Sequence, residues 1–283
     1  MSMINVALIA YIAASIAYIV KEVWWSHTIR FYASGILGAA FILNGIIVIG
    51  RWIQSGHAPF ANLYESLVFY ALCISFVYLV LEAIYKFRVV GALASVMALL
   101  VLAYASMQDE TIRPLMPALQ SNWLTVHVIT YFIGYAAFGI SFITSIVFLV
   151  VRPFTKQIAN NPETADASAG TPRTFDKLGY QIVAFGFPFL TLGMITGAVW
   201  AKKAWGDYWS WDPKETWSLI TWLVYLAYLH LPLVLPRMNL KKAKIPIIQS
   251  VCLLIAFGVV AFTYLGLSYL PSASESEHIY GAK

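Results

Sequence analysis

Long apolar stretches separated by short polar connectors run through all 283 residues of this chain. A hydrocarbon core of about 30 Å requires around twenty apolar residues in a helix, because each residue rises only about 1.5 Å. Eight stretches meet that length, approximately residues 3–20, 31–50, 63–85, 89–106, 123–151, 178–200, 216–236 and 245–270. The pattern therefore predicts an all-α polytopic membrane protein with about eight transmembrane helices.

Composition supports the same class, because 60% of the residues are hydrophobic and only 11% are charged. About a quarter of the residues in a soluble domain are charged. We find no internal repeat and no boundary between soluble domains, so we expect one integral membrane domain over residues 1–283. Residues 152–177, with Pro153 near their start, are expected to form a cytoplasmic connector that is poor in apolar bulk between Asn160 and Pro172.

The basic residues orient the predicted helices. Twelve of the eighteen Lys and Arg residues fall in the connectors of one side, and the other six are Arg51, Arg113, Lys202, Lys203, Lys214 and Lys283. Positive residues accumulate on the cytoplasmic side of a membrane protein, so the richer side faces inward. Both termini and the connector between spans six and seven then face outward. The positive net charge is explained by membrane orientation, and we expect lipid contact and no nucleic-acid partner.

Five of the ten tryptophans lie between residues 200 and 217, around this outer connector. Asp212, Pro213 and Glu215 fit an N-cap, a first-turn proline and an N3 acid, which would start the seventh helix. Capping does not explain the aromatic residues before it, Trp205, Tyr208, Trp209 and Trp211, with Gly206 permitting a close backbone approach. One interpretation is an aromatic belt at the membrane interface. The other is a flat platform for a large planar ligand, whose acidic groups would meet Lys202, Lys203 or Lys214.

This connector resembles the WWD motif, WGxYWxWDxxE, of the CcsA (ResC) family and its relatives CcmC and CcmF, through Trp205-Gly-Asp-Tyr-Trp-Ser-Trp-Asp-Pro-Lys-Glu215. A second stretch resembles CcsA itself, Pro59-Phe-Ala-Asn-Leu-Tyr-Glu-Ser-Leu67. The resemblance implies System II cytochrome c biogenesis, with residues 201–215 as a haem-binding loop. It implies haem b as ligand and substrate, and apocytochrome c and a CcsB-type membrane protein as partners. It also implies a bacterial cytoplasmic membrane or a thylakoid membrane, with the loop on the periplasmic or lumenal side.

The histidines are sorted by the predicted topology. His127 and His278 lie on the outer side, one before and one after the WWD motif, and the resemblance implies that they are the axial ligands of the outer haem. The sequence around His278 differs from the Gly-Leu-His-Ser-Tyr-like setting of relatives. His230 lies fourteen residues into span seven, about 21 Å along the helix. An ionisable residue at that depth is a functional candidate, and the resemblance implies a second haem position with its other ligand from CcsB. His27 and His57 are interpreted as interfacial.

Four other charged residues are possible contributors to the predicted site. Glu65 and Glu82 flank span three and are expected to meet water or headgroups. Arg51 and Arg113 are candidates to neutralise acidic groups of the ligand on the outer side, because guanidinium suits carboxylate recognition.

The resemblance implies a holocytochrome c synthase, active with CcsB, in which this chain carries haem across the membrane and presents it for thioether attachment to a CxxCH motif. We find no nucleophile–base pair, so no catalytic residue is assigned. The alternative is a CcmC-like haem exporter or chaperone without ligation activity, and a general transporter with an aromatic belt is a third interpretation.

Overall fold

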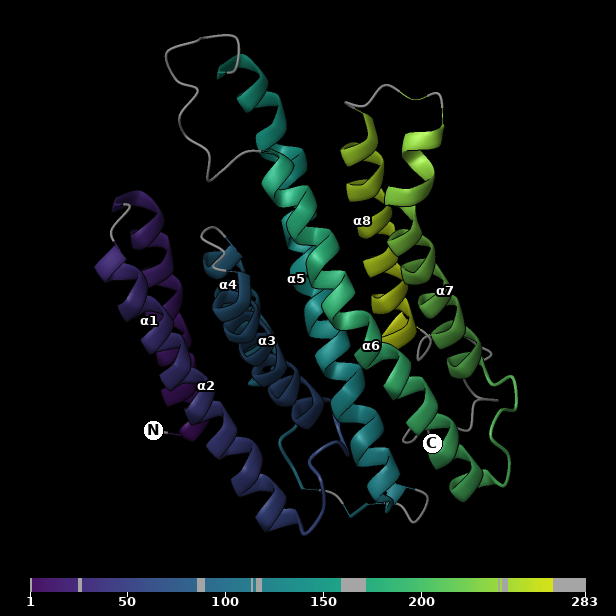
Figure 1. The fold of residues 1–283 in the computed structure, drawn as a ribbon. Coiled ribbons are helices and arrows are strands. Elements are labelled where there is room, and N and C mark those ends of the chain that lie inside the picture. The colour runs from purple at the N-terminus through teal and green to yellow at the C-terminus, as the bar shows by residue number, and fades with distance from the viewer. Residues whose placement is uncertain are drawn as a thin grey trace. The chain divides into compact units, whose positions relative to one another are not determined.

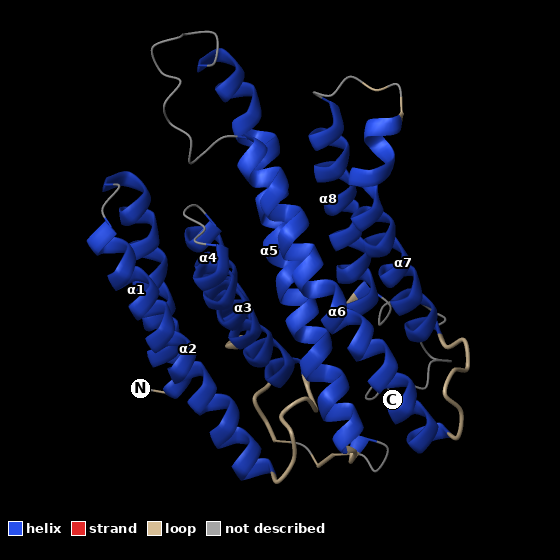
Figure 2. Cartoon of the chain, in the orientation of Figure 1, coloured by secondary structure: helices blue, strands red, loops and turns tan. Residues whose placement is uncertain are grey.

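The computed structural model describes residues 2–24, 27–85, 90–112, 114–115, 119–158, 172–238, 240 and 244–266. Within these ranges the chain is helical between its loops and contains no strand (Figure 2). Seven helices are long and apolar enough to cross a membrane, and the shorter apolar helix α4 has 16 residues. The predicted all-α polytopic fold is confirmed. The helices in Figure 1 are α1 (Met3–Trp24), α2 (His27–Ser55), α3 (Leu63–Tyr85), α4 (Val90–Ala105), α5 (Asn122–Ile158), α6 (Pro172–Trp205), α7 (Pro213–Val234), the 3-10 turn η4 (Leu235–Arg237) and α8 (Ile245–Tyr264).

Helices α5 and α6 extend into the connector expected at residues 152–177. Helix α5 continues to Ile158 with Pro153 inside it, and α6 begins at Pro172. A proline removes one backbone donor, and a membrane protein can satisfy the carbonyl that this frees through neighbouring helices or local adjustments. The proline therefore lies within the helix and does not end it. The rest of the expected connector lies outside the described residues.

The chain divides into two compact units, unit 1 over Met1–Ile140 and unit 2 over Ser141–Lys283. The expectation of one integral membrane domain over residues 1–283 stays a prediction. Unit 1 holds α1 to α4 and the first half of α5. Unit 2 holds the second half of α5, α6, α7 and α8.

In unit 1, α1 packs against α2 and α4, while α3 packs against α2 and α4. Helix α1 buries Ala7, Tyr11, Ala14 and Tyr18 completely. Their spacing of three to four residues places them in one stripe along the helix. Small residues in such a stripe allow helices to approach closely, which matters in lipid because burial of apolar surface does not drive helices together there.

Polar side chains link the helices inside unit 1. The Tyr11 hydroxyl lies 2.8 Å from the Ser75 hydroxyl, and Tyr18 donates a hydrogen bond of 2.9 Å to Glu82. The Ser34 hydroxyl donates to the same Glu82 oxygen at 2.8 Å. Glu82 is only 5% exposed, so the expectation that it meets water or headgroups was wrong. The residue lies among helices that supply hydroxyl donors, and it joins α1, α2 and α3.

Unit 2 is held by contacts that tie α7 and α8 to each other and to neighbouring helices. Figure 1 draws α6 to α8 in green to yellow. A hydroxyl pair joins α7 and α8, an indole N–H of α7 donates to a hydroxyl of α6, and two phenyl rings stack between α5 and α8. These contacts are Thr221–Thr263 at 3.1 Å, Trp222–Thr191 at 2.9 Å and Phe142–Phe257 at 4.6 Å between ring centroids.

We expect Gly91→Ala to destabilise unit 1. A β-carbon at Gly91 would lie 2.5 Å from Tyr18 Cε1 and would also contact the Tyr78 hydroxyl. Relieving such an overlap in a packed core lowers the free energy of unfolding by about 1–3 kcal/mol. Thermal unfolding of the purified protein in detergent measures the change. Gly35→Ala in α2 is the matched control, because its β-carbon would have no neighbour within 4 Å. Equal unfolding temperatures for the two variants would contradict the close packing at Gly91.

Candidate functional site: the tryptophan-rich loop

The tryptophan-rich loop begins where α6 ends, at Trp205. Gly206 has a φ of 98°, and its N–H donates to the Lys202 carbonyl at 3.2 Å. A β-carbon at Gly206 would have no neighbour within 4 Å. Glycine is therefore favoured here by the positive φ that ends the helix, and the close backbone approach expected from the sequence stays a prediction. Within the expected range 201–215, the part outside helices is residues 206–212.

The loop ends in a capping box at the start of α7. Asp212 Oδ1 accepts the Lys214 N–H at 2.8 Å, and Pro213 is the first helical residue. Glu215 Oε2 accepts the N–H of Asp212 at 3.3 Å and that of Ser210 at 2.7 Å. This arrangement satisfies backbone donors that the first turn of a helix leaves without partners. The capping role predicted for these residues is confirmed.

The aromatic rings of the loop meet edge to face. Trp209 and Trp211 lie 5.7 Å apart with an angle of 88° between their planes, and Trp200 and Trp205 lie 4.5 Å apart at 72°. Tyr208 is 59% exposed and Trp211 is 69% exposed. These steep angles between the rings differ from the flat platform inferred from the sequence. Tyr208 and Trp211 are therefore the most exposed aromatic residues of the loop.

Trp211 has a strained backbone. Its φ of 62° makes it the one residue other than glycine with a positive φ in the part of the chain that the structure describes. A residue with a β-carbon loses roughly 1–2 kcal/mol in this conformation. Such strain concentrates at functional sites, where the surrounding structure holds it in place. Here the capping box fixes the following residue, and the Trp211 ring remains exposed.

The loop also contains polar groups suited to an acidic ligand. The Trp209 indole N–H is buried and has no acceptor among the described residues. Buried indole donors normally find a partner, so this donor is available to an acceptor that the described residues do not supply. Lys202 donates to the Gly206 carbonyl and lies 5.6 Å from the centre of the Tyr208 ring, while Lys203 is exposed. Aromatic rings, a buried donor and lysines suit a planar ligand with carboxylates.

His230 is exposed on α7 and makes a hydrogen bond within its own helix. Its Nδ1 lies 2.7 Å from the Leu226 carbonyl oxygen. A carbonyl can only accept, so Nδ1 carries the hydrogen and the neutral ring has a lone pair on Nε2. His230 follows Pro213 by seventeen residues, about 26 Å along the helix. The structure therefore keeps His230 apart from the tryptophan-rich loop.

The other histidines belong to unit 1 or lie outside the described residues. The His127 ring on α5 packs against Tyr131, with 4.6 Å between the ring centroids. His278 lies outside the described residues. His57 lies in the α2–α3 loop, where its Nδ1 is 3.0 Å from the Ala58 carbonyl oxygen.

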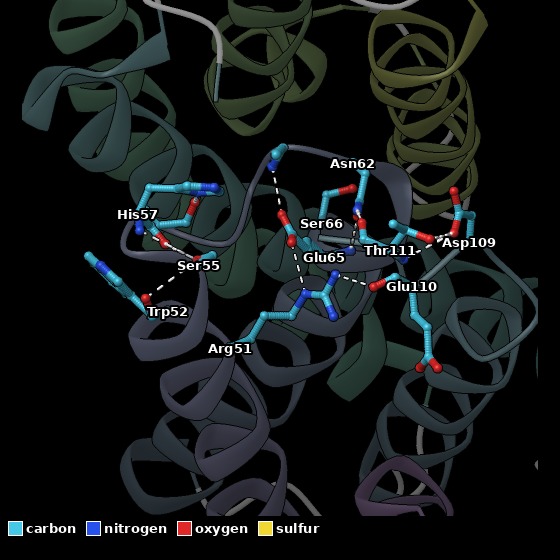
Figure 3. Close-up of polar contacts among 12 residues, drawn as sticks. Arg51, Trp52, Ser55, His57, Asn62, Glu65, Ser66, Asp109, Glu110 and Thr111 are labelled. Carbon is cyan, nitrogen blue, oxygen red and sulfur yellow. Dashed lines mark hydrogen bonds and ion pairs between the residues drawn. The ribbon is translucent and has the colours of Figure 1, made fainter. Parts of the chain in front are cut away.

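A buried ion pair in unit 1 was missed by the sequence interpretation (Figure 3). Arg51 Nε donates to Glu65 Oε1 at 2.8 Å, and the Glu65 side chain is 0% exposed. Glu65 Oε2 accepts the Ala61 N–H at 2.8 Å. The expectation that Glu65 meets water or headgroups was wrong. The guanidinium of Arg51 is engaged inside the chain, and Arg113 lies outside the described residues.

Comparisons with known proteins agree with the resemblance in the sequence. A family model for cytochrome c assembly proteins matches residues 60–273. CcsA of Chlamydomonas reinhardtii is 40% identical over 259 residues, which cover 87% of this chain and 67% of that protein. The chain belongs to the CcsA family of cytochrome c assembly proteins. CcsA of Porphyra purpurea is 35% identical, with 92% of each chain covered, and CcsA of Synechococcus elongatus is 36% identical, with 82% and 81% covered.

One solved structure, of the cytochrome c haem lyase CcmF, resembles this CcsA-family chain with a TM-score of 0.61 and 16% identity. The match covers 93% of this chain but 48% of that lyase, so the chain spans about half of it. At this identity the likeness shows the shared fold alone.

We expect Asp212→Ala to loosen the start of α7. Loss of an N-cap side chain costs about 1 kcal/mol, because the Lys214 N–H loses its acceptor. Hydrogen exchange at the first-turn amides of α7 should become faster. Asp207→Ala, at an exposed carboxylate of the same loop, is the control. If the two variants exchange equally at these amides, the capping box does not hold the loop.

Proposed function

We propose that this chain is the haem-handling subunit of a cytochrome c synthase. It carries haem b across the membrane and presents it for thioether attachment to apocytochrome c. The single observation that carries the proposal is the tryptophan-rich loop, because its exposed rings and its buried donor occur together in a member of the CcsA family. We place the protein in a bacterial cytoplasmic membrane or a thylakoid membrane, with the loop on the periplasmic or lumenal side. The lower number of basic residues on that side supports this orientation.

The outer haem is held in this proposal by His127, His278 and the loop. Imidazole nitrogen is a common axial ligand of haem iron. Tyr208 and Trp211 supply exposed aromatic surface, and the Trp209 N–H supplies a donor for a propionate. Lysines near the loop add positive charge. These features fit an amphipathic planar molecule that binds through its rings, its carboxylates and its metal.

His230 provides the proposed second position, nearer the cytoplasm. Its Nδ1–H is held by the Leu226 carbonyl, so Nε2 can face a metal. A hydrogen bond from the second ring nitrogen fixes the orientation of a ligating histidine and raises its basicity. Because the side chain is exposed on its helix, a membrane partner of the CcsB type can supply the opposite ligand. This chain would then supply one ligand of the site, and the membrane partner would supply the other.

The chemistry proposed for the outer site is positioning. Each thiol of the CxxCH motif adds across a vinyl group of haem, forming a carbon–sulfur bond while the thiol hydrogen goes to the other vinyl carbon. Holding both reactants in a productive geometry replaces an encounter in solution with an effectively intramolecular step. The residues of this chain would orient the ring system and keep the iron ligated. We assign no catalytic acid, base or nucleophile.

A second candidate function is a haem exporter or chaperone that transfers haem without joining it to protein, as CcmC-like proteins do. The similarity to CcsA proteins over most of the chain favours the synthase.

We expect His127→Ala, His278→Ala and His230→Ala each to change the absorption spectrum of haem in the purified protein with its partner. Loss of one axial imidazole leaves the iron five-coordinate, which shifts it toward the high-spin form. His57→Ala is the control, because His57 is assigned no ligand role. Haem content and spectra that match those of the unmodified protein in all three variants would refute the ligand assignment.

We expect cells without this chain to make no covalent cytochrome c, and Trp211→Ala to reduce its formation because a contact surface for haem is lost. Cytochrome c carrying covalent haem is measured by haem staining after denaturing electrophoresis. Normal formation without the chain would exclude the synthase. Formation that returns when haem is supplied on the outer side would instead favour the exporter.

A further inference from the structure

Two loops of this chain share one construction. In the α2–α3 loop Gly56 ends a helix with a φ of 73°, and its N–H donates to the Trp52 carbonyl at 3.0 Å. Asn62 then accepts the Glu65 N–H at 2.8 Å, and Glu65 accepts the Ala61 N–H at 2.8 Å.

The tryptophan-rich loop repeats this order at the same spacing. A glycine with positive φ is followed after six residues by the N-cap residue, and after three more by a glutamate that binds backbone N–H groups of the loop. The three positions of the second loop are Gly206, Asp212 and Glu215. Unit 1 therefore contains a counterpart of the loop that we assign to haem.

The two loops differ in what the glutamate does. In unit 1, Glu65 is buried and pairs with Arg51. Arg51 Nη2 donates in addition to the Glu110 carbonyl, and Asn62 Nδ2 donates to the Thr111 carbonyl at 3.1 Å (Figure 3). We call Arg51, Asn62 and Glu65, together with these two carbonyls, the Arg51 clasp. The clasp joins the end of α2, the start of α3 and the loop that leads into α5.

A series of side-chain contacts connects the clasped segments to α5. In the α2–α3 loop, Phe60 packs against Phe69 of α3 with 4.9 Å between ring centroids, and Phe69 packs against Phe132 of α5 at 5.7 Å. The Tyr70 hydroxyl of α3 donates to the Tyr135 carbonyl of α5 at 3.2 Å.

The same part of α5 carries His127. Tyr135 packs against Tyr131 at 5.4 Å, and Tyr131 packs against His127 at 4.6 Å. The first half of α5 is thus held against the α3 surface.

We propose that Arg51 and Glu65 are positioning residues that fix His127 for iron ligation at the outer site. This inference rests on the proposed function. A buried ion pair adds little net stability compared with an apolar pair, because both charges lose their water, but in some proteins it selects one arrangement of the segments that it joins. In this protein, the arrangement selected by the Arg51–Glu65 pair sets the position of α5, the helix that carries His127. Of the two similar loops, one presents aromatic rings to haem and the other holds a histidine in place.

The test compares Arg51→Gln, Glu65→Gln and the double variant with the unmodified full chain, purified with its membrane partner. Partners that orient a metal ligand typically change metal affinity by about tenfold or more when they are replaced. We expect about a tenfold weaker haem affinity at the outer site and a shift toward the high-spin spectrum. Added imidazole should restore the low-spin spectrum, as in His127→Ala, because it substitutes for a displaced ligand.

Two further variants keep the result interpretable. Glu110→Gln is the matched control, because its exposed carboxylate is changed while the carbonyl that binds Arg51 remains. The double variant guards against misfolding, since it removes both charges and leaves no unpaired buried carboxylate. We expect Glu110→Gln to behave as the unmodified protein, and the double variant to fold but to lose outer-site haem.

Three results would overturn the inference. One is unmodified haem affinity and spectrum in folded Arg51→Gln, Glu65→Gln and double variants. Another is a loss of haem that imidazole does not reverse, or an equal loss of haem at the His230 position, since either result would indicate a general structural role. The last is an unchanged spectrum in His127→Ala, which would also refute the ligand assignment of the proposed function. A changed spectrum in His127→Ala with unchanged clasp variants would refute the positioning role alone.

Discussion

The absence of water in the hydrocarbon core is the constraint on which this structure depends. Every backbone N–H and C=O that crosses the membrane must find its partner inside the chain, so the spanning segments are helices. The unpaired backbone groups are then concentrated at the helix ends. The two loops with capping glutamates satisfy these groups with their own side chains. Capping side chains therefore lie where α3 and α7 begin, beside the segments that we assign to ligand binding and positioning.

The buried carboxylates of unit 1 contact polar side chains of other helices. Glu82 accepts hydrogen bonds from hydroxyls of α1 and α2, and Glu65 pairs with Arg51. Each isolated group would be costly in lipid, where apolar contacts supply no force to bring helices together. Their pairing gives unit 1 specific helix–helix contacts. Unit 2 uses hydroxyl and indole contacts for the same purpose.

Hydropathy alone predicted the number and class of the helices, because the length of an apolar stretch must match the membrane. The start of α7 was also predicted, since Asp212, Pro213 and Glu215 are signals that act within one turn. The burial of Glu65 and Glu82 was not predicted, because their partners lie on helices distant in sequence. The repeated loop spacing was not predicted for a related reason. Only three positions match in sequence. The two loops resemble each other in backbone conformation and capping, and these are seen only from φ and the hydrogen bonds.

The left-handed backbone of Trp211 has a consequence for how such a loop can change over time. A glycine at this position would relax the backbone, so sequence drift toward a more stable loop leads away from the exposed indole. The more stable loop would lack one of its exposed rings, so stability and the proposed ligand contact oppose each other at this position. Random variants selected for heat resistance alone should therefore lose the indole.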